Sequence, residues 1–243
     1  MSSSLLSRIA HAEAGAHAAQ APAGHERFGP LLAVWTEDAE PLDTAWHDGS
    51  RPPTPQEWAA FEMFCNQHGQ TPTVHALSHA APSLLPTLNG RGYHLQDLLH
   101  LYTHDLRELP ELKAAHVRLT HDAEAWARVA ALGFGTGTES IMRAVAQAPG
   151  KRLWWAEVDS AKAATGAYSL LDGVAMLHGA ATRPEFRGRG LQSGLLAARL
   201  HAAKGEGATL ATVMVTPDTG SERNVLRAGF KLTGLRLTWT RPA

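Results

Sequence analysis

A predicted strand, a glycine-rich turn and a predicted helix follow one another in the last third of this chain. The strand covers Val174 to Thr182, the helix covers Leu191 to Lys204, and the segment Arg187 to Gly190 between them reads Arg-Gly-Arg-Gly. Glycine lets the backbone approach a ligand closely, and the first amides of a helix lack partners within it and favour negative charge. The arrangement therefore predicts an anion site suited to a pyrophosphate, although taken alone it is also compatible with a solvated basic turn.

The spacing of the glycines excludes two common phosphate-binding motifs. Ser193 stands where the dinucleotide fingerprint Gly-x-Gly-x-x-Gly needs its third glycine, and no Gly-Lys-Ser or Gly-Lys-Thr sequence marks a Walker loop. A formal net charge of −1 over 243 residues is unlike the basic excess of nucleic-acid-binding proteins, so no nucleic-acid partner is expected. The 14 histidines are scattered along the chain, and we expect no metal site.

Cysteine content and hydropathy indicate where the protein resides. Cys65 is the only cysteine, which rules out an intrachain disulfide and suits a reducing compartment. No apolar run approaches the roughly 20 residues that span a bilayer, and no basic segment precedes a long apolar stretch near Met1. We therefore expect a cytoplasmic protein with no membrane partner and no signal peptide, in which Met1 to Gln20 form a frayed or loosely docked helix.

Two series of secondary-structure elements follow one another along the chain. In the first series, Thr54 caps a helix with Pro55 at its first position and Glu57 three residues after the cap, which is a capping box. The other elements of this series are strands at 31–36, 73–77 and 93–103, a loop at 37–53 and a short helix at 83–89. The second series has strands at 117–119, 153–158, 163–170, 174–182, 210–215 and 230–240, and helices at 121–132, 139–148, 191–204 and 221–228.

The order of these elements predicts an α/β (α+β) protein with a mixed central sheet flanked by helices. A charged connection at 106–114, which contains Pro110, separates the two series. We expect an N-terminal extension over residues 1–27, a first half over residues 28–110 and a second domain over residues 111–243.

Two motifs of the second series resemble those of the Gcn5-related N-acetyltransferases, the GNAT superfamily. The residues 187–192 match the motif Arg/Gln-x-x-Gly-x-Gly/Ala, except that Gln192 replaces Gly or Ala. The strand at 177–182 resembles the bulged strand of the family, and the segment 220–230, which ends in Gly-Phe, resembles its motif B. The resemblance covers residues 115–241 well and the first half weakly. The helix at 55–68 is not preceded by Arg-Gly-x-Gly, so the whole chain looks like a tandem GNAT protein with one donor site.

The resemblance implies transfer of an acetyl group from acetyl-CoA, the co-substrate, to a primary amine of a small molecule or peptide. Backbone amides at 180–182 would polarise the thioester carbonyl. The implied CoA contacts come from the loop, the strand before it and the motif B helix: Ala180, Ala181, Thr182, Arg187, Gly188, Arg189, Gly190, Leu191, Gln192, Ser193, Gly194 and Asn224.

The acid and base of such a reaction are less clearly marked. Val225 stands four residues before Gly229, where many family members carry a tyrosine that protonates the leaving thiolate. Ser221 is a candidate substitute, although a helix N-cap is its simpler role. Glu157 and His178 are the candidate bases, with a surface charge and a satisfied histidine as the simpler interpretations.

Two alternatives to an enzyme stay open at this point. A non-catalytic acetyl-CoA-binding sensor or interaction module would need the donor loop but no acid. An unrelated anion-binding α/β domain would require both motif matches to be accidental. The acceptor and the oligomeric state are not indicated by the sequence.

Overall fold

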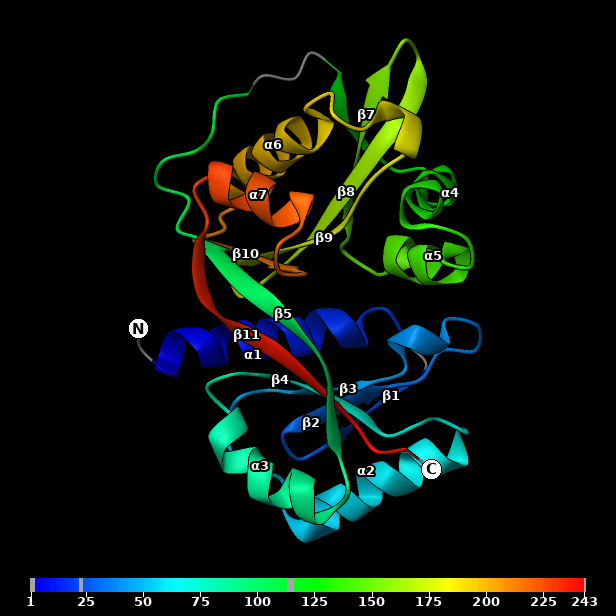
Figure 1. Cartoon of the computed structure of the whole chain (residues 1–243), viewed down its shortest axis with the longest axis vertical. Helices are drawn as coiled ribbons and strands as arrows, with labels where there is room; N and C mark the ends of the chain where they lie inside the picture. The colour runs from blue at the N-terminus through cyan, green and yellow to red at the C-terminus, as the bar shows by residue number, and fades with distance from the viewer. Residues whose placement is uncertain (1–2, 22–23, 113–115, 243) are drawn as a thin grey trace. The chain divides into compact units, whose positions relative to one another are not determined.

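The computed structural model describes residues 3–21, 24–112 and 116–242. The chain folds into two compact units, one made of Met1–Leu101 with Thr233–Ala243 and the other of Tyr102–Leu232; we call them unit 1 and unit 2. Each contains a mixed sheet with helices on both faces (Figure 1), so the predicted fold class is confirmed. Strands β5 (His94–His104) and β11 (Lys231–Thr240) have residues in both units.

The sheet of unit 1 has neighbouring strands in the order β1-β2-β3-β4-β11-β5, and most of β5 belongs to this unit. Pairing is antiparallel between β1 and β2, between β2 and β3 and between β4 and β11, and it is parallel between β3 and β4. The end of the chain therefore completes the sheet of the first unit, with Thr240 opposite Thr73. The elements are α1 (Ser3–Ala18), β1 (His25–Phe28), β2 (Leu31–Val34), β3 (Ala45–His47), α2 (Pro55–Gln67), β4 (Thr73–Leu77) and α3 (Ala81–Gly90).

Helix α1 corrects one expectation, since it is not loosely docked. Ile9, Ala10 and Ala12 are fully buried, and the helix packs on β2, β3 and β4. The small alanine side chains let the helix lie close to the sheet, which a segment with few large apolar side chains did not suggest. Helices α2 and α3 cover the opposite face, where Trp58 and Leu84 enter a shared core.

Two short strands of unit 1 were not predicted. Strand β3 lies inside the segment 37–53 that we expected to be a loop, and β1 lies at the end of the expected extension. Strand β3 has only three residues, and β1 is a largely exposed edge strand of polar sequence. Neither is long enough for an alternating pattern to be recognised.

The sheet of unit 2 has the order β10-β9-β8-β7-β6 and is antiparallel except for the parallel pair of β9 and β10. Helices α6 and α7 cover one face, and α4 and α5 cover the other (Figure 1). The elements are β6 (Val117–Thr120), α4 (Ala123–Phe134), α5 (Glu139–Gln147), β7 (Arg152–Val158), β8 (Ala161–Leu171), β9 (Val174–Thr182), α6 (Leu191–Gly205), β10 (Leu210–Val215) and α7 (Gly220–Arg227).

Strand β9 carries the bulge that the family resemblance predicted. Ala167 pairs with His178 and Thr165 pairs with Ala181, so two residues of β9 oppose Gly166. Gly179 sits in the bulge with φ +59°, and a Cβ there would lie 2.4 Å from Cη2 of Trp126. This position therefore requires glycine.

Strands β9 and β10 part just before the bulge. Their pairing ends at Leu177 and Val213, whereas β9 continues to Thr182. The parting exposes the end of β9 next to the start of α6, which is where the predicted site lies.

Candidate functional site

The N-terminal end of α6 has no side-chain cap. Its N-cap residue is Gly190, in the left-handed conformation with φ +74° and ψ +6°, and no side chain bonds to the first amides. The first backbone bond runs from the amide of Gly194 to the carbonyl of Gly190. Nothing lies within 4 Å of the position that a Cβ would take at Gly188 or Gly190. The helix end therefore presents donors to open space, as anion binding requires.

A cavity of about 910 Å³ adjoins this helix end and is lined wholly by residues of unit 2. This volume lies within the range of small-molecule and cofactor sites. The cavity brings together seven residues that the sequence singled out, namely Arg189, Gly190, Leu191, Ser193, Gly194, Asn224 and Glu157.

Gln192 and Arg187 hold the loop in place and do not line the cavity. The side-chain amide of Gln192 donates to the carbonyls of Ala181, at 2.8 Å, and Thr165, at 3.1 Å, and lies 3.1 Å from Oγ1 of Thr182. It thereby bonds to backbone acceptors on both strands beside the β8–β9 bulge. The guanidinium of Arg187 donates to the carbonyls of Thr182 and Gly133. The departure from the motif at Gln192 thus has a structural role.

Arg189 is the arginine of the loop that lines the cavity. It is exposed, and its guanidinium lies 5.4 Å from the ring centre of Phe186. Arg183 lies over the same ring at 5.2 Å and pairs with Glu185. Cation–π contact with Phe186 orients Arg189 without neutralising it, so its charge stays available to a ligand.

Glu157 lies on the cavity wall at an irregularity of β7. Its carboxylate forms an ion pair with Arg118 of the neighbouring strand. The backbone amide of Glu157 donates to the carbonyl of His116, at 3.0 Å. His116 also lines the cavity and was not predicted. The register of Val117 with Ala156 places His116 beside Glu157, which strand pairing alone could have revealed.

The other two catalytic candidates do not line the cavity. His178 is half-buried in β9 opposite Ala167. Ser221 is exposed at the second residue of α7. The expectation that Ser221 caps this helix is wrong, because the helix begins one residue earlier and Thr219 accepts the hydrogen bond from the amide of Glu222.

A fully buried arginine lies beneath the bulge. Arg199 of α6 is 1% exposed and donates to the carbonyls of Leu195, Ala167 and His178. Burial lowers its pKa to about 10, so it remains charged at neutral pH. A Cβ at Gly166 would lie 2.7 Å from its Cζ. Arg199 therefore ties α6 to both strands of the bulge.

No tyrosine lines the cavity, as far as the described residues show. The hydroxyl of Tyr102 donates to Glu222 at 2.7 Å and that of Tyr168 donates to Glu206 at 2.8 Å. Burial raises the pKa of both, to about 12 for Tyr102. Val225, at the position where the family often has tyrosine, is buried.

The part of the chain that the structure describes has neither a metal-binding cluster nor a helix that could span a membrane. There, no three His, Cys, Asp or Glu side chains come close enough together to hold a metal ion. Within the same ranges, no helix has the length and apolar character needed to cross a bilayer.

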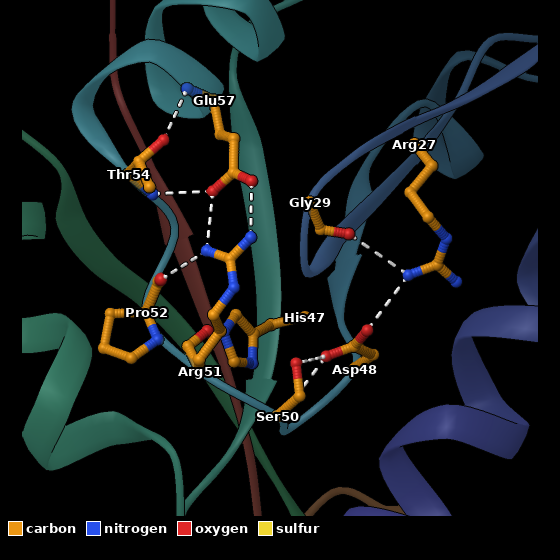
Figure 2. A network of polar contacts seen from close by, with 9 residues as sticks. All are labelled: Arg27, Gly29, His47, Asp48, Ser50, Arg51, Pro52, Thr54 and Glu57. Atoms are coloured by element: carbon orange, nitrogen blue, oxygen red, sulfur yellow. Dashed lines mark hydrogen bonds and ion pairs between the residues drawn. The ribbon is translucent and has the colours of Figure 1, made fainter.

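Helix α2 of unit 1 also follows a strand, but side chains bond to its N-terminal end, which we call closed (Figure 2). The hydroxyl of Thr54 accepts from the amide of Glu57, at 3.2 Å, while the Glu57 carboxylate accepts from the amide of Thr54, at 2.7 Å. Arg51 donates to both carboxylate oxygens, at 2.8 and 2.5 Å. The hydrogen bonds from Arg51 and Thr54 lower the pKa of Glu57 to about 2. The predicted capping box is confirmed.

Comparison with known proteins places these features in context. Residues 111–230 match the model of the acetyltransferase (GNAT) family. No curated protein matches the chain.

Several solved structures have a similar fold. A GCN5-related N-acetyltransferase from Kribbella flavida matches with a TM-score of 0.75 and 20% identity, over 98% of this chain and 96% of the other. A GNAT-family protein from Novosphingobium aromaticivorans matches with a TM-score of 0.62 and 14% identity, over 93% and 96%. A tandem GNAT protein from the clavulanic acid biosynthesis pathway matches with a TM-score of 0.57 and 17% identity, over 86% and 77%.

Proposed function

We propose that this chain, which belongs to the GNAT acetyltransferase family through residues 111–230, transfers an acetyl group from acetyl-CoA to a primary amine. One observation carries the proposal: the uncapped end of α6, with left-handed Gly190, opens on a cavity of about 910 Å³. The acceptor is a small molecule or a peptide amine.

Residues of unit 2 suit the pyrophosphate of acetyl-CoA. The open space at Gly188 and Gly190 admits a ligand to the backbone, the first amides of α6 supply donors, and Arg189 supplies charge. Asn224 and Arg227 stand on another part of the cavity wall. The Arg227 guanidinium donates to the Asn224 side-chain oxygen at 2.5 Å, which leaves the amide nitrogen of Asn224 as a donor for the pantetheine arm.

The reaction needs a neutral amine, a polarised carbonyl and a proton for the leaving sulfur. The amine nitrogen attacks the thioester carbon, the carbon–sulfur bond breaks, and the nitrogen loses a proton while the thiolate gains one. Backbone amides at 180–182, in the part of β9 that has left β10, are the proposed donors to the carbonyl oxygen. Holding both reactants in one cavity supplies much of the rate.

Glu157 and His116 are the proposed groups that accept the amine proton, directly or through water, because both line the cavity. His178 and Ser221 are weaker candidates, since neither lines the cavity. We assign no tyrosine to the thiolate, because the hydroxyls of Tyr102 and Tyr168 donate to glutamates elsewhere. Solvent is the proposed proton source for the sulfur.

Unit 1 is proposed to be a second, degenerate GNAT-like half. It repeats a parallel strand pair joined by a helix, with β3, α2 and β4 in the order that β9, α6 and β10 have in unit 2. The closed end of α2 leaves it without a donor site of its own. Along the sequence, residues 28–110 are the proposed first half and residues 111–243 the proposed donor domain, whose last strand β11 pairs with β4 of unit 1.

Acetyl-CoA binding is tested with Gly190→Glu and a matched control, Gly207→Glu. Both glycines have positive φ and open space around them, but Gly207 lies beyond the other end of α6. Calorimetry should show a loss of affinity on the order of a hundredfold for Gly190→Glu and little change for Gly207→Glu. Equal affinity of Gly190→Glu and the parent chain would show that the site is misplaced.

Turnover is tested by thiol release from acetyl-CoA across a panel of primary amines. Amine-dependent release that Gly190→Glu abolishes is the expected result. Tight acetyl-CoA binding without release for any small-molecule or peptide amine would instead support the sensor or interaction module.

A further inference from the structure

A second cavity, of about 400 Å³, lies within unit 1 and is lined almost entirely by polar residues. His75 of β4 and Arg236 and Thr238 of β11 form its floor. They alternate along their strands with Val74, Ala76 and Trp239, which belong to the core beneath α2 and α3. The cavity is therefore on the opposite face of the sheet from the core, and the proposed acetyl-CoA site, which belongs to unit 2, does not use it.

Arg236 is a half-buried cation on this floor, and its charge partner Asp97 is partly exposed. Its side chain is 20% exposed, and its Nη2 donates to Asp97 at 3.1 Å, a carboxylate that is itself 49% exposed. Its Nε is buried and has no hydrogen-bond partner among the described residues. Burial lowers the pKa of Arg236, against the opposing effect of Asp97 and Glu13. An anion bound at the part of the guanidinium that lines the cavity would add a second negative partner for this charge.

Asp43 is the matching anion on another wall of the cavity. It is 9% exposed, and its Oδ1 accepts hydrogen bonds from the amide and the hydroxyl of Thr36, both at 2.7 Å. Burial raises the pKa of Asp43, and no ion pair involves it within the described ranges. A cation in the cavity would stabilise this carboxylate.

The unit thus keeps a half-buried positive group and a buried negative group on the wall of a single cavity without pairing them with each other. We propose that the cavity binds a small zwitterion of the amino-acid class, with its carboxylate against Arg236 and its ammonium against Asp43. Thr73 and Thr238, whose hydroxyls are bonded to Thr240 and His75, also line the cavity. Glu40, which is exposed at the rim, favours a ligand with an additional positive charge.

The first test compares probes by calorimetry on the full chain without acetyl-CoA. L-alanine should bind at least tenfold more tightly than propionate or ethylammonium, which each keep only one of its two charges. L-lysine should bind more tightly than L-alanine, and L-glutamate more weakly. Failure of every amino acid to bind, or equal binding of the single-charge analogues, would overturn the proposal.

The second test uses variants. Asp43→Asn keeps the size of the side chain and an oxygen that can accept both bonds from Thr36, so the fold is expected to persist. It should weaken L-lysine binding at least tenfold, while Asp38→Asn, in the same loop but outside the cavity wall, should not. Arg236→Lys keeps the charge without the Nε donor and should also weaken binding. Unchanged affinity in Asp43→Asn would contradict the assignment.

Gly190→Glu separates this proposal from the function of unit 2. It should abolish acetyl-CoA binding and leave L-lysine affinity unchanged, whereas Asp43→Asn should do the reverse. Loss of L-lysine binding in Gly190→Glu would show that the amino acid occupies the cavity of unit 2.

Discussion

Helices α2 and α6 each join two parallel strands. Their N-terminal ends differ in capping, in nearby charge and in the space that an anion could occupy. Helix α6 begins at a left-handed glycine with no side-chain cap and faces a large cavity. Helix α2 begins with a threonine cap, a proline and a glutamate held by an arginine. The position of a helix in the fold therefore does not make an anion site; the few residues at its end do.

The closed end of α2 contains an internal substitute for an anion (Figure 2). The carboxylate of Glu57 takes the donors of Arg51 and of the Thr54 amide that a phosphate would need. Pro55 removes one more amide. The fit is close, since a Cβ at Gly29 would lie 2.1 Å from Oε1 of Glu57. A phosphate would have to displace a group that is already bonded and charged alike.

The largest effect on acetyl-CoA affinity is expected at Gln192, whose hydrogen bonds hold the start of α6 against β8 and β9. Gln192→Ala removes the bonds to the carbonyls of Ala181 and Thr165 and leaves these backbone acceptors without a partner. Acetyl-CoA affinity should fall on the order of tenfold, as for loss of a buried hydrogen bond. Calorimetry measures this, with Lys204→Ala on the same helix as the control. If affinity is unchanged, the loop does not depend on Gln192.

At the closed N-terminal end of α2, the expected effect is on the stability of the fold and not on acetyl-CoA binding. Thr54→Ala removes the cap of α2 and should lower the free energy of unfolding by about 1 kcal/mol, measured by chemical denaturation. Acetyl-CoA affinity should be unchanged. A loss of affinity in this variant would mean that α2 contributes to the donor site after all.

The pH dependence of stability gives a smaller effect at the same end. The pKa of Glu57 is lowered from 4.5 to about 2 in the folded chain, so its ionised form stabilises the fold above about pH 4.5. This contribution is lost as the pH falls from about 4.5 towards 2. The difference in stability between the parent chain and Glu57→Gln should therefore shrink over that window. A difference that is constant from pH 7 to pH 3 would contradict the role given to the Arg51 pair.

The smallest effect is expected at the other end of α6. Tyr168 bonds to Glu206, the C-cap residue of that helix. Tyr168→Phe should leave the rate of thiol release nearly unchanged. A loss of a hundredfold or more, on the order expected for a general acid, would show that Tyr168 reaches the sulfur by another route.

Local patterns in the sequence predicted the elements of unit 2 and both helix ends well. Strands β9 and β10 have the predicted bounds, because continuous apolar runs bounded by turns mark them. The turn at Asp172 and Gly173 has the positive φ values that its sequence indicates. The capping box of α2 could also be read from its spacing alone.

Features that depend on distant parts of the chain could not be predicted in this way. The pairing of β11 with β4 joins segments far apart in sequence, and so does the place of His116 on the cavity wall. The role of Gln192 depends on two carbonyls, of Ala181 and Thr165, that lie on paired strands beside the bulge. The charges of Asp43 and Arg236, which do not pair with each other, likewise come together only through the fold of unit 1.

The stoichiometry of acetyl-CoA binding tests the contrast between the two helix ends most directly. Calorimetry on the full chain should give one acetyl-CoA per chain, and Gly190→Glu should reduce this to none. Two per chain, with the second surviving in Gly190→Glu, would contradict the account, because a second donor site would then exist outside the open end of α6.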